Sequence, residues 1–226
     1  MNRWIDWQAD VERYGWKDAV VSRLVSRLGK HLGVHIYRIG ERPFEAYPKK
    51  WVSPSGTRVA LLSEEELRHA TQDPDLDMSL DFVKGAISRK DVAVGAFKGD
   101  QLACYIFATT ELAPHDEDFW VRVKPPYRYT YKGFTLPEYR GEGLSDYVNN
   151  VPERNEVFGS RGCTKAIFFV AASNLPSLKF ISKVQDAPWI GLAVTAKIFK
   201  RRVSFYTPRV RDAGFEFVAA PAAVIT

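Results

Sequence analysis

The chain has 226 residues, of which 46% are hydrophobic and 26% are charged, and its formal net charge at pH 7 is +5. This composition supports one large domain, or one domain with an extension, and excludes a disordered chain. Two cysteines are too few for a disulfide framework or a structural zinc site, so we expect buried free thiols and no metal. No apolar run approaches the length of a membrane span and the first residues lack the layout of a signal peptide, so we expect a cytoplasmic protein.

Residues 1–56 read as an N-terminal extension that contains a basic amphipathic helix. Over residues 17–32, apolar side chains recur at helical spacing with basic ones between them, and tryptophans precede the segment. The apolar positions are Val20, Val21, Leu24, Val25 and Leu28. Such a helix either packs on the domain, which is the usual role of an apolar face, or lies on an anionic membrane surface. A short strand over 34–39 and a segment rich in proline and glycine then predict a domain boundary.

From residue 57 to residue 206 the hydrophobic pattern is regular and predicts one domain of strands and helices. The predicted strands are 57–62, 91–97, 101–110, 119–123, 128–136, 165–172, 190–200 and 203–206. The predicted helices are 63–72, opened by a capping box at Ser63 and Glu66, then 76–89, a segment from about 144 that breaks at Pro152, and 174–184. Residues 111–118 are expected to form an acidic loop, and residues 207–226 a C-terminal tail.

The most informative stretch is the glycine-rich turn that follows the strand 128–136. Pro137 stops the strand, Arg140-Gly141-Glu142-Gly143 follows, and a helix begins at about Leu144. Glycines let the backbone approach an anion, the N–H groups at a helix start face it, and Arg140 adds a cation, so the natural ligand is a pyrophosphate. The stretch lacks the third glycine of a dinucleotide fingerprint and the Gly-Lys-Ser/Thr of a P-loop. The alternative is a purely conformational turn.

This stretch resembles motif A of the GNAT superfamily, the acyl-CoA-dependent N-acetyltransferases. Arg140, Gly143 and Ser145 fall on the three fixed places of the pattern Arg/Gln-x-x-Gly-x-Gly/Ala, with Ser145 where glycine or alanine is usual. Residues 174–180, Asn-Leu-Pro-Ser-Leu-Lys-Phe, resemble motif B of the same family. The resemblance covers about residues 57–206. It implies an α/β fold with a mixed, mostly antiparallel central sheet flanked by helices, to which the helical N-terminal extension is added.

The resemblance also implies acetyl-CoA, or another acyl-CoA, as co-substrate, and direct transfer of its acyl group to an amine in a ternary complex. A backbone N–H group in the last part of the motif A strand would polarise the thioester carbonyl, and the loop would hold the pyrophosphate. Glu142 must then point to solvent. The expected cofactor-binding residues are Phe134, Thr135, Leu136, Arg140, Gly141, Glu142, Gly143, Leu144, Ser145, Asn174, Ser177 and Phe180. For Asn174, a role at a helix start is the alternative.

The groups for proton transfer are less well defined. Many family members carry a tyrosine seven residues after the motif B asparagine, where this chain has Ile181. Tyr131 is a candidate acid, because strand alternation puts it on one face with Tyr129 and Thr135. His115, which lies among carboxylates, is a candidate base. The alternatives are a packed phenol for Tyr131 and a solvated loop for His115.

We expect the acceptor to be a small-molecule amine or amino sugar rather than a protein, held between the acidic loop and the helices of residues 62–89. A non-catalytic module of the same fold, which binds CoA or a partner without turnover, is the alternative function. We expect no nucleic-acid partner. Contact of the N-terminal helix with a membrane, and assembly into a homo-oligomer, are left open.

Overall fold

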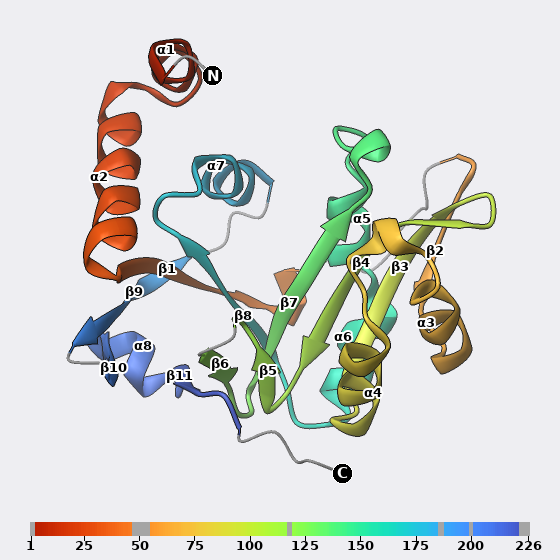
Figure 1. Cartoon of the computed structure of the whole chain (residues 1–226). Helices are drawn as coiled ribbons and strands as arrows, with labels where there is room; N and C mark the ends of the chain where they lie inside the picture. Colours follow the sequence, from red (N-terminus) through yellow and green to blue (C-terminus); the bar gives the residue numbers. More distant parts are fainter. Residues whose placement is uncertain (1–2, 47–54, 117–118, 185–187, 199–200, 222–226) are drawn as a thin grey trace. The chain divides into compact units, whose positions relative to one another are not determined.

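The structure is a computed structural model that describes residues 3–46, 55–116, 119–184, 188–198 and 201–221 (Figure 1). Contacts divide the chain into two compact units. Unit 1 comprises Met1–Glu41 and Phe168–Gly214, and unit 2 comprises Arg42–Ile167 and Phe215–Thr226. Two strands, β1 (Val34–Pro43) and β8 (Lys165–Ala171), contribute residues to both units. The three predicted domains have different bounds and stay a prediction.

The sheet of unit 2 has the strand order β8-β7-β4-β3-β2. Its other strands are β2 (Thr57–Leu61), β3 (Val92–Lys98), β4 (Gln101–Thr109) and β7 (Tyr127–Thr135). Neighbours are antiparallel except β7 and β8, which pair in parallel from Tyr127↔Lys165 to Tyr129↔Ile167. Strands β3 and β4 are buried along nearly their whole length, which is expected of strands covered on both faces.

Helices lie on both faces of this sheet. They are α3 (Glu64–Ala70), α4 (Leu80–Ser88), α5 (Leu144–Asn149) and α6 (Pro152–Gly159), and Figure 1 shows α4 in front of the strands and α6 behind them. Leu144 of α5 packs into a buried cluster with Ile106 of β4. On the opposite face, the ring of Phe82 in α4 meets that of Phe107 edge-on, with centroids 4.9 Å apart. The predicted break at Pro152 is confirmed, since this proline is the first residue of α6.

A second, three-stranded sheet of unit 2 has the order β11-β6-β5. Its strands are β5 (Leu112–Pro114), β6 (Phe119–Arg122) and β11 (Glu216–Ala219). The expected acidic loop therefore contains a strand, and the expected C-terminal tail contains β11 and the helix α8 (Pro208–Asp212). Neither β5 nor β11 was predicted, because strands of three or four residues show little of a hydrophobic period.

Unit 1 has the strand order β10-β9-β1-β8. β9 (Trp189–Ile198) pairs in antiparallel fashion with β10 (Arg201–Tyr206) and with β1, which is longer than predicted. Its helices are α1 (Arg3–Tyr14), α2 (Trp16–Leu32), α7 (Leu175–Val184) and α8. The Ser22 hydroxyl of α2 donates to the carbonyl oxygen of Ser173 at 2.8 Å, just before α7. The predicted N-terminal helix thus packs on the rest of unit 1.

The predicted fold class is confirmed: a mixed, mostly antiparallel sheet with flanking helices and N-terminal helices. Cys104 and Cys163 are buried free thiols, as predicted, and burial raises the pKa of Cys104 to about 11. No helix in the described part of the chain combines the length and apolarity needed to cross a membrane. Among the described residues, no group of three His, Cys, Asp or Glu side chains could hold a metal ion.

Candidate functional site

The glycine loop, residues 140–145, connects the short 3-10 helix η3 (Pro137–Tyr139) to α5. Gly141 has φ 93° and Gly143 has φ 75°, in the left-handed region where other residues are strained. A Cβ atom built on either glycine would meet no atom of the described residues within 4 Å, so they leave the space above the loop open. Leu144 is 2% exposed and anchors the loop in the core. The glycines therefore serve the path of the backbone, and that path leaves room for a ligand.

The hydrogen bonds of the loop leave several backbone donors unused. Its turns employ the N–H groups of Arg140, Glu142 and Asp146, which donate to the carbonyl oxygens of Pro137, Tyr139 and Gly143. Within the described part of the chain, the N–H groups of residues 141, 143, 144 and 145 form no hydrogen bond of their own. A run of free N–H groups at a helix start suits an anion.

The charged side chains of the loop are held by their neighbours. The Arg140 Nε donates to the Thr135 carbonyl oxygen at 3.2 Å, which draws the guanidinium over the end of β7. The Glu142 carboxylate pairs at 2.9 Å with the ammonium of Lys98, the last residue of β3. A second link to that hairpin runs from the Tyr139 hydroxyl to the Gln101 side chain at 2.9 Å. The expected outward position of Glu142 is consistent with this exposed ion pair, and its charge is compensated there.

Strand β7, which leads into the loop, contains a β-bulge that sequence reasoning missed. Tyr131 lies opposite Phe107 and Phe134 opposite Tyr105, so the two residues 132 and 133 share a single partner position on β4. Lys132 adopts a left-handed φ of 51° and its ammonium pairs with the carboxylate of Asp77. A bulge of this kind shifts the alternation of side chains beyond it.

Because of the bulge, Thr135 does not share a face of β7 with Tyr129 and Tyr131, contrary to the prediction from the sequence. Tyr129 and Tyr131 are stacked with ring centroids 5.9 Å apart, as alternation predicts. Beyond the bulge, however, it is Phe134 that stacks on Tyr105, next to the ring of Phe107, with centroids 5.7 Å apart. Thr135 lies on the opposite face, where its hydroxyl donates to the Cys104 sulfur at 3.2 Å.

The strand register also shows which backbone N–H group near the end of β7 is available to donate to a thioester carbonyl. The N–H of Leu136 already donates to the Ala103 carbonyl oxygen at 2.9 Å, so Leu136 has no free N–H for a ligand. Hydrogen-bonded and non-hydrogen-bonded pairs alternate along an antiparallel ladder. Leu136 and Ala103 form a hydrogen-bonded pair, so the next pair, Thr135–Cys104, is not hydrogen-bonded. The N–H of Thr135 therefore points away from β4.

Tyr131 is buried in a small polar cluster. Its hydroxyl donates to the Asp91 carboxylate at 2.7 Å and accepts from the Arg89 guanidinium at 3.1 Å. The Asp91 side chain is fully buried, and burial raises its pKa against the opposing effects of hydrogen bonds from Thr109 and Tyr131. Burial, together with the charge of Asp91, also raises the pKa of Tyr131. The phenolic proton is engaged by a carboxylate, which does not favour the predicted role of Tyr131 as an acid.

His115 lies at the end of β7 that is remote from the glycine loop. It follows β5 and is exposed, with its ring centroid 5.8 Å from that of Phe217 in β11. β5 and β6 precede the first residue of β7, whereas the glycine loop follows the last one, and Figure 1 shows them at opposite ends of that strand. Glu117 and Asp118 lie outside the described residues. The structure therefore does not bring the acidic loop to the glycine loop.

Motif B lies in unit 1. Asn174 precedes α7, and its side-chain oxygen accepts from the backbone N–H of Ser177 at 3.2 Å, so it caps the helix. Asn174 is exposed, while Ser177 and Ile181 are half-buried. The side chain of Phe180 lies outside the described residues. The capping role of Asn174, offered as an alternative from the sequence, is thus present in unit 1.

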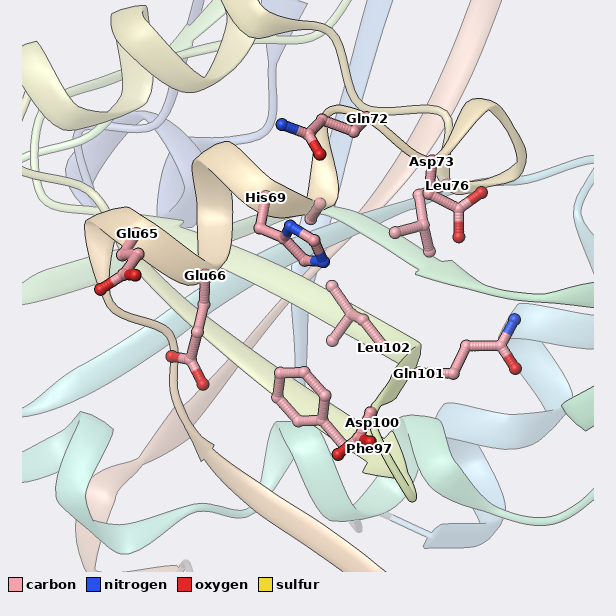
Figure 2. A pocket seen from close by; sticks show the side chains of 11 residues that line it. Glu65, Glu66, His69, Gln72, Asp73, Leu76, Phe97, Asp100, Gln101 and Leu102 are labelled. Atoms are coloured by element: carbon pink, nitrogen blue, oxygen red, sulfur yellow. The ribbon is translucent and has the colours of Figure 1, made fainter.

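A cavity of about 530 Å³ lies between α3, the 3-10 helix η2 (Pro74–Leu76) and the β3–β4 hairpin (Figure 2). Its floor is apolar and buried, formed by Ala70, Leu76, Phe97 and Leu102. Its rim carries the polar side chains of Glu65, Glu66, His69, Gln72, Asp73, Asp100 and Gln101. Four carboxylates and no lysine or arginine line the cavity, so its rim attracts cations.

Two of these carboxylates, those of Glu66 and Asp73, already bind neighbouring groups of the chain. Glu66 accepts from the Ser63 N–H and pairs with Arg58, and these contacts lower its pKa, chiefly through the backbone hydrogen bond. Asp73 caps η2. In the described part of the chain, Glu65 and Asp100 form no ion pair. The cavity shares Gln101 with the contact to Tyr139, so one hairpin supports both the cavity wall and the glycine loop.

No protein-family model matches the sequence, and no curated protein matches it. Among solved structures, the chain is similar to a GCN5-related N-acetyltransferase from Kribbella flavida, with 13% identity, a TM-score of 0.41, and 89% of this chain and 65% of that one covered. A tandem GNAT protein from the clavulanic acid biosynthesis pathway has 11% identity, a TM-score of 0.48, and coverages of 87% and 59%. AAC(6')-Iy, solved with the bisubstrate analogue CoA-S-monomethyl-acetylneamine, has 17% identity, a TM-score of 0.44, and coverages of 69% and 99%.

The order of elements decides the fold. From β2 to β10 the chain runs through a strand, two helices, antiparallel strands, the glycine loop with its helix, a parallel strand, a helix and two further strands. This is the order of elements that the hydrophobic pattern of the sequence predicted. The chain has a GNAT-like fold. It spans 56% to 65% of the length of the first structures that it matches.

Within this GNAT-like fold, sequence reasoning found the loop and missed the cavity. The glycines and Arg140 were visible as a local pattern, whereas the cavity is built by residues from three separate elements. Only two weak indications of the cavity were present in the sequence. These are the acidic first turn of α3, Glu64–Glu66, and the acidic turn residue Asp100. The acceptor pocket was expected between the helices of residues 62–89 and the acidic loop; the cavity uses α3, but the hairpin takes the place of the loop.

Proposed function

We propose that this chain is an acyl-CoA-dependent N-acyltransferase, most simply an acetyltransferase, that transfers the acyl group directly to an amine in a ternary complex. The observation that carries the proposal is the glycine loop. It combines two left-handed glycines, open space above them, free N–H groups at residues 141 and 143–145, and the cation of Arg140. This set of donors fits a pyrophosphate.

The chain's own residues would act chiefly as hydrogen-bond donors. The loop N–H groups and Arg140 would hold the pyrophosphate of CoA, and Glu142, paired with Lys98, would not repel it. The N–H of Thr135 would then polarise the thioester carbonyl, because it points away from β4 and is not needed by that ladder. Such a donor stabilises the charge that develops on the carbonyl oxygen when the amine attacks. Phe134, Asn174, Ser177 and Phe180 remain proposed contacts of the co-substrate.

The proposed acceptor is a small, cationic amine or amino sugar. Support comes from the cavity beside the β3–β4 hairpin, where an apolar floor lies below a rim with Glu65 and Asp100, two carboxylates that pair with no cation among the described residues. A ligand with an apolar body and one or more ammonium groups would match both parts. The amine must lose a proton before it attacks, so an acceptor whose pKa lies near neutral pH suits this site best.

A non-catalytic module that binds CoA is the second candidate. Two observations favour it: Ile181 stands where many GNAT proteins carry a tyrosine, and the phenol of Tyr131 is engaged by Asp91. A screen of an amine library for release of CoA thiol separates the two functions, because only an enzyme releases thiol in the presence of an acceptor.

Calorimetry with acetyl-CoA tests the glycine loop itself. Gly143→Asp puts a side chain and a negative charge into the space above the loop, so we expect the affinity to fall at least about a hundredfold, or about 3 kcal/mol. Gly162→Asp is the matched control, since Gly162 also has a left-handed φ, 81°, and open space around it, but lies in the turn before β8. Equal affinity of the two variants would refute the proposed site.

A further inference from the structure

Helix α2 presents two different faces. One face packs on unit 1: Ala19 is 1% exposed, Val25 is 9% exposed, and Ser22 bonds to Ser173. Beside this face, four apolar residues recur at intervals of three and four and form one line along the helix. We call this line the α2 stripe; it consists of Val21, Leu24, Leu28 and Leu32, exposed by 51%, 54%, 37% and 61%.

The α2 stripe is the main concentration of exposed apolar side chains in the described part of the chain. Eight large hydrophobic residues are markedly exposed there, and five of them belong to α2: the stripe and Trp16, which is 63% exposed. Isolated exposed leucines are ordinary, whereas a line of them on one helix marks an interaction surface. α2 contacts the rest of unit 1 through the adjoining side, where Val25 lies four residues after Val21, and the stripe itself stays exposed.

α2 carries more basic than acidic side chains, with four lysine or arginine residues and one aspartate. Lys17 lies four residues before Val21, and Arg27 and His31 each lie three residues after a stripe leucine, so all three share its side of the helix. All three are exposed, and none forms an ion pair within the described part of the chain. Asp18, the single acidic residue of α2, lies three residues before Val21 and borders the N-terminal end of the stripe beside Lys17.

We propose that the α2 stripe docks on an anionic lipid surface, with the helix axis parallel to the membrane plane. Apolar residues along one side, a tryptophan at one end and flanking cations are the features of a helix that lies in the interface of a bilayer. The charges argue against a second copy of this chain as the occupant. Two facing α2 stripes would bring together two helices that each carry four lysine or arginine residues and one aspartate, so like charges would predominate, which repels.

Co-sedimentation of the full chain with vesicles tests this inference. We expect binding to vesicles of phosphatidylcholine mixed with phosphatidylglycerol, weaker binding to phosphatidylcholine alone, and a decrease with added salt. Replacing two stripe residues, Leu24→Asp with Leu28→Asp, should weaken binding about tenfold or more, because it removes apolar contact and adds repulsion. The matched control is Leu80→Asp with Leu192→Asp, two leucines exposed by 43% and 41% on other elements, which should bind like the unchanged chain.

Circular dichroism and thermal unfolding of each variant would show that its fold is kept, as the exposure of these positions leads us to expect. Lys17→Gln with Arg27→Gln should remove the preference for the anionic lipid while leaving a weaker, salt-insensitive binding. Equal binding of the stripe variant and the control variant would overturn the proposal. So would a stable dimer in light scattering that the stripe variant abolishes, because the stripe would then be a self-association surface.

Discussion

The substitution Tyr131→Phe tests how the buried cluster beside the bulge works. It removes one hydroxyl, which donates to Asp91 at 2.7 Å and accepts from Arg89 at 3.1 Å, while the ring and its packing on Phe107 and Tyr129 remain. A hydrogen bond to a charged group contributes about 1.5–3 kcal/mol, and the Asp91 side chain is fully buried. We therefore expect a loss of about 2 kcal/mol in the free energy of unfolding, or about 4–8 °C in Tm for a chain of this length.

The matched control is Tyr105→Phe. The hydroxyl of Tyr105 donates to the Leu76 carbonyl oxygen at 2.7 Å, a neutral acceptor, so its removal should cost only about 1 kcal/mol. Chemical denaturation of both variants gives the two values. A cost for Tyr131→Phe no greater than that for Tyr105→Phe would refute the idea that this hydroxyl stabilises a buried charge.

The cost of Tyr131→Phe should also depend on pH in a definite direction. Burial raises the pKa of Asp91 in the folded chain, so Asp91 contributes an unfolding free energy that falls as the pH rises from the ordinary carboxyl pKa to the raised one. The Tyr131 hydroxyl lowers that pKa, and its removal raises the pKa further. The difference in unfolding free energy between the variant and the unchanged chain is therefore largest at a pH above the raised pKa of Asp91. It is smallest at a pH below the ordinary carboxyl pKa, where Asp91 is protonated in both proteins. A difference that does not change with pH would contradict this assignment.

Three further substitutions test the proposed chemistry. His115→Gln should leave the pH profile of kcat/KM unchanged, because His115 lies at the far end of β7; a fall of about a hundredfold would make it a general base after all. Glu65→Gln with Asp100→Asn should raise KM for a cationic amine about fivefold at unchanged affinity for acetyl-CoA, since each exposed charge contributes under about 1 kcal/mol. Ile181→Tyr should leave kcat unchanged in steady-state assays, whereas a gain would show that protonation of the leaving thiolate limits the rate.

Elements fixed by neighbouring residues could be predicted from the sequence. The capping box of α3 is one: the Ser63 hydroxyl accepts from the Glu66 N–H at 3.1 Å, and the Glu66 carboxylate accepts from the Ser63 N–H at 2.8 Å. The glycine loop is another, because a left-handed turn before a helix requires glycine at particular places. In both cases the physical cause lies within a few residues of the pattern that reveals it.

Features that depend on distant residues could not be predicted. The bulge in β7 needs Lys132 in a left-handed conformation, which the ion pair with Asp77 supports from 55 positions away. Strand β1 lies between β8 and β9, both far along the chain, and no local pattern encodes that order. The engagement of Tyr131 by Asp91 likewise joins two strands, so the sequence could offer Tyr131 as a free acid when the fold occupies its proton.

Taken with the proposed function, these contacts argue that the chain does its chemistry by positioning rather than by acid–base groups. Tyr131 shares its proton with Asp91, His115 lies far from the glycine loop, and Ile181 cannot exchange a proton. What the loop and the end of β7 do offer are backbone N–H groups and Arg140, which in the proposed function would hold phosphates and a carbonyl oxygen in place. Correct placement of two reactants can supply about 7 kcal/mol or more of a barrier. The proton must then leave the amine before attack, so the inflection of kcat/KM with pH should move with the pKa of the amine used. An inflection that stays fixed across amines would instead belong to a group of the protein.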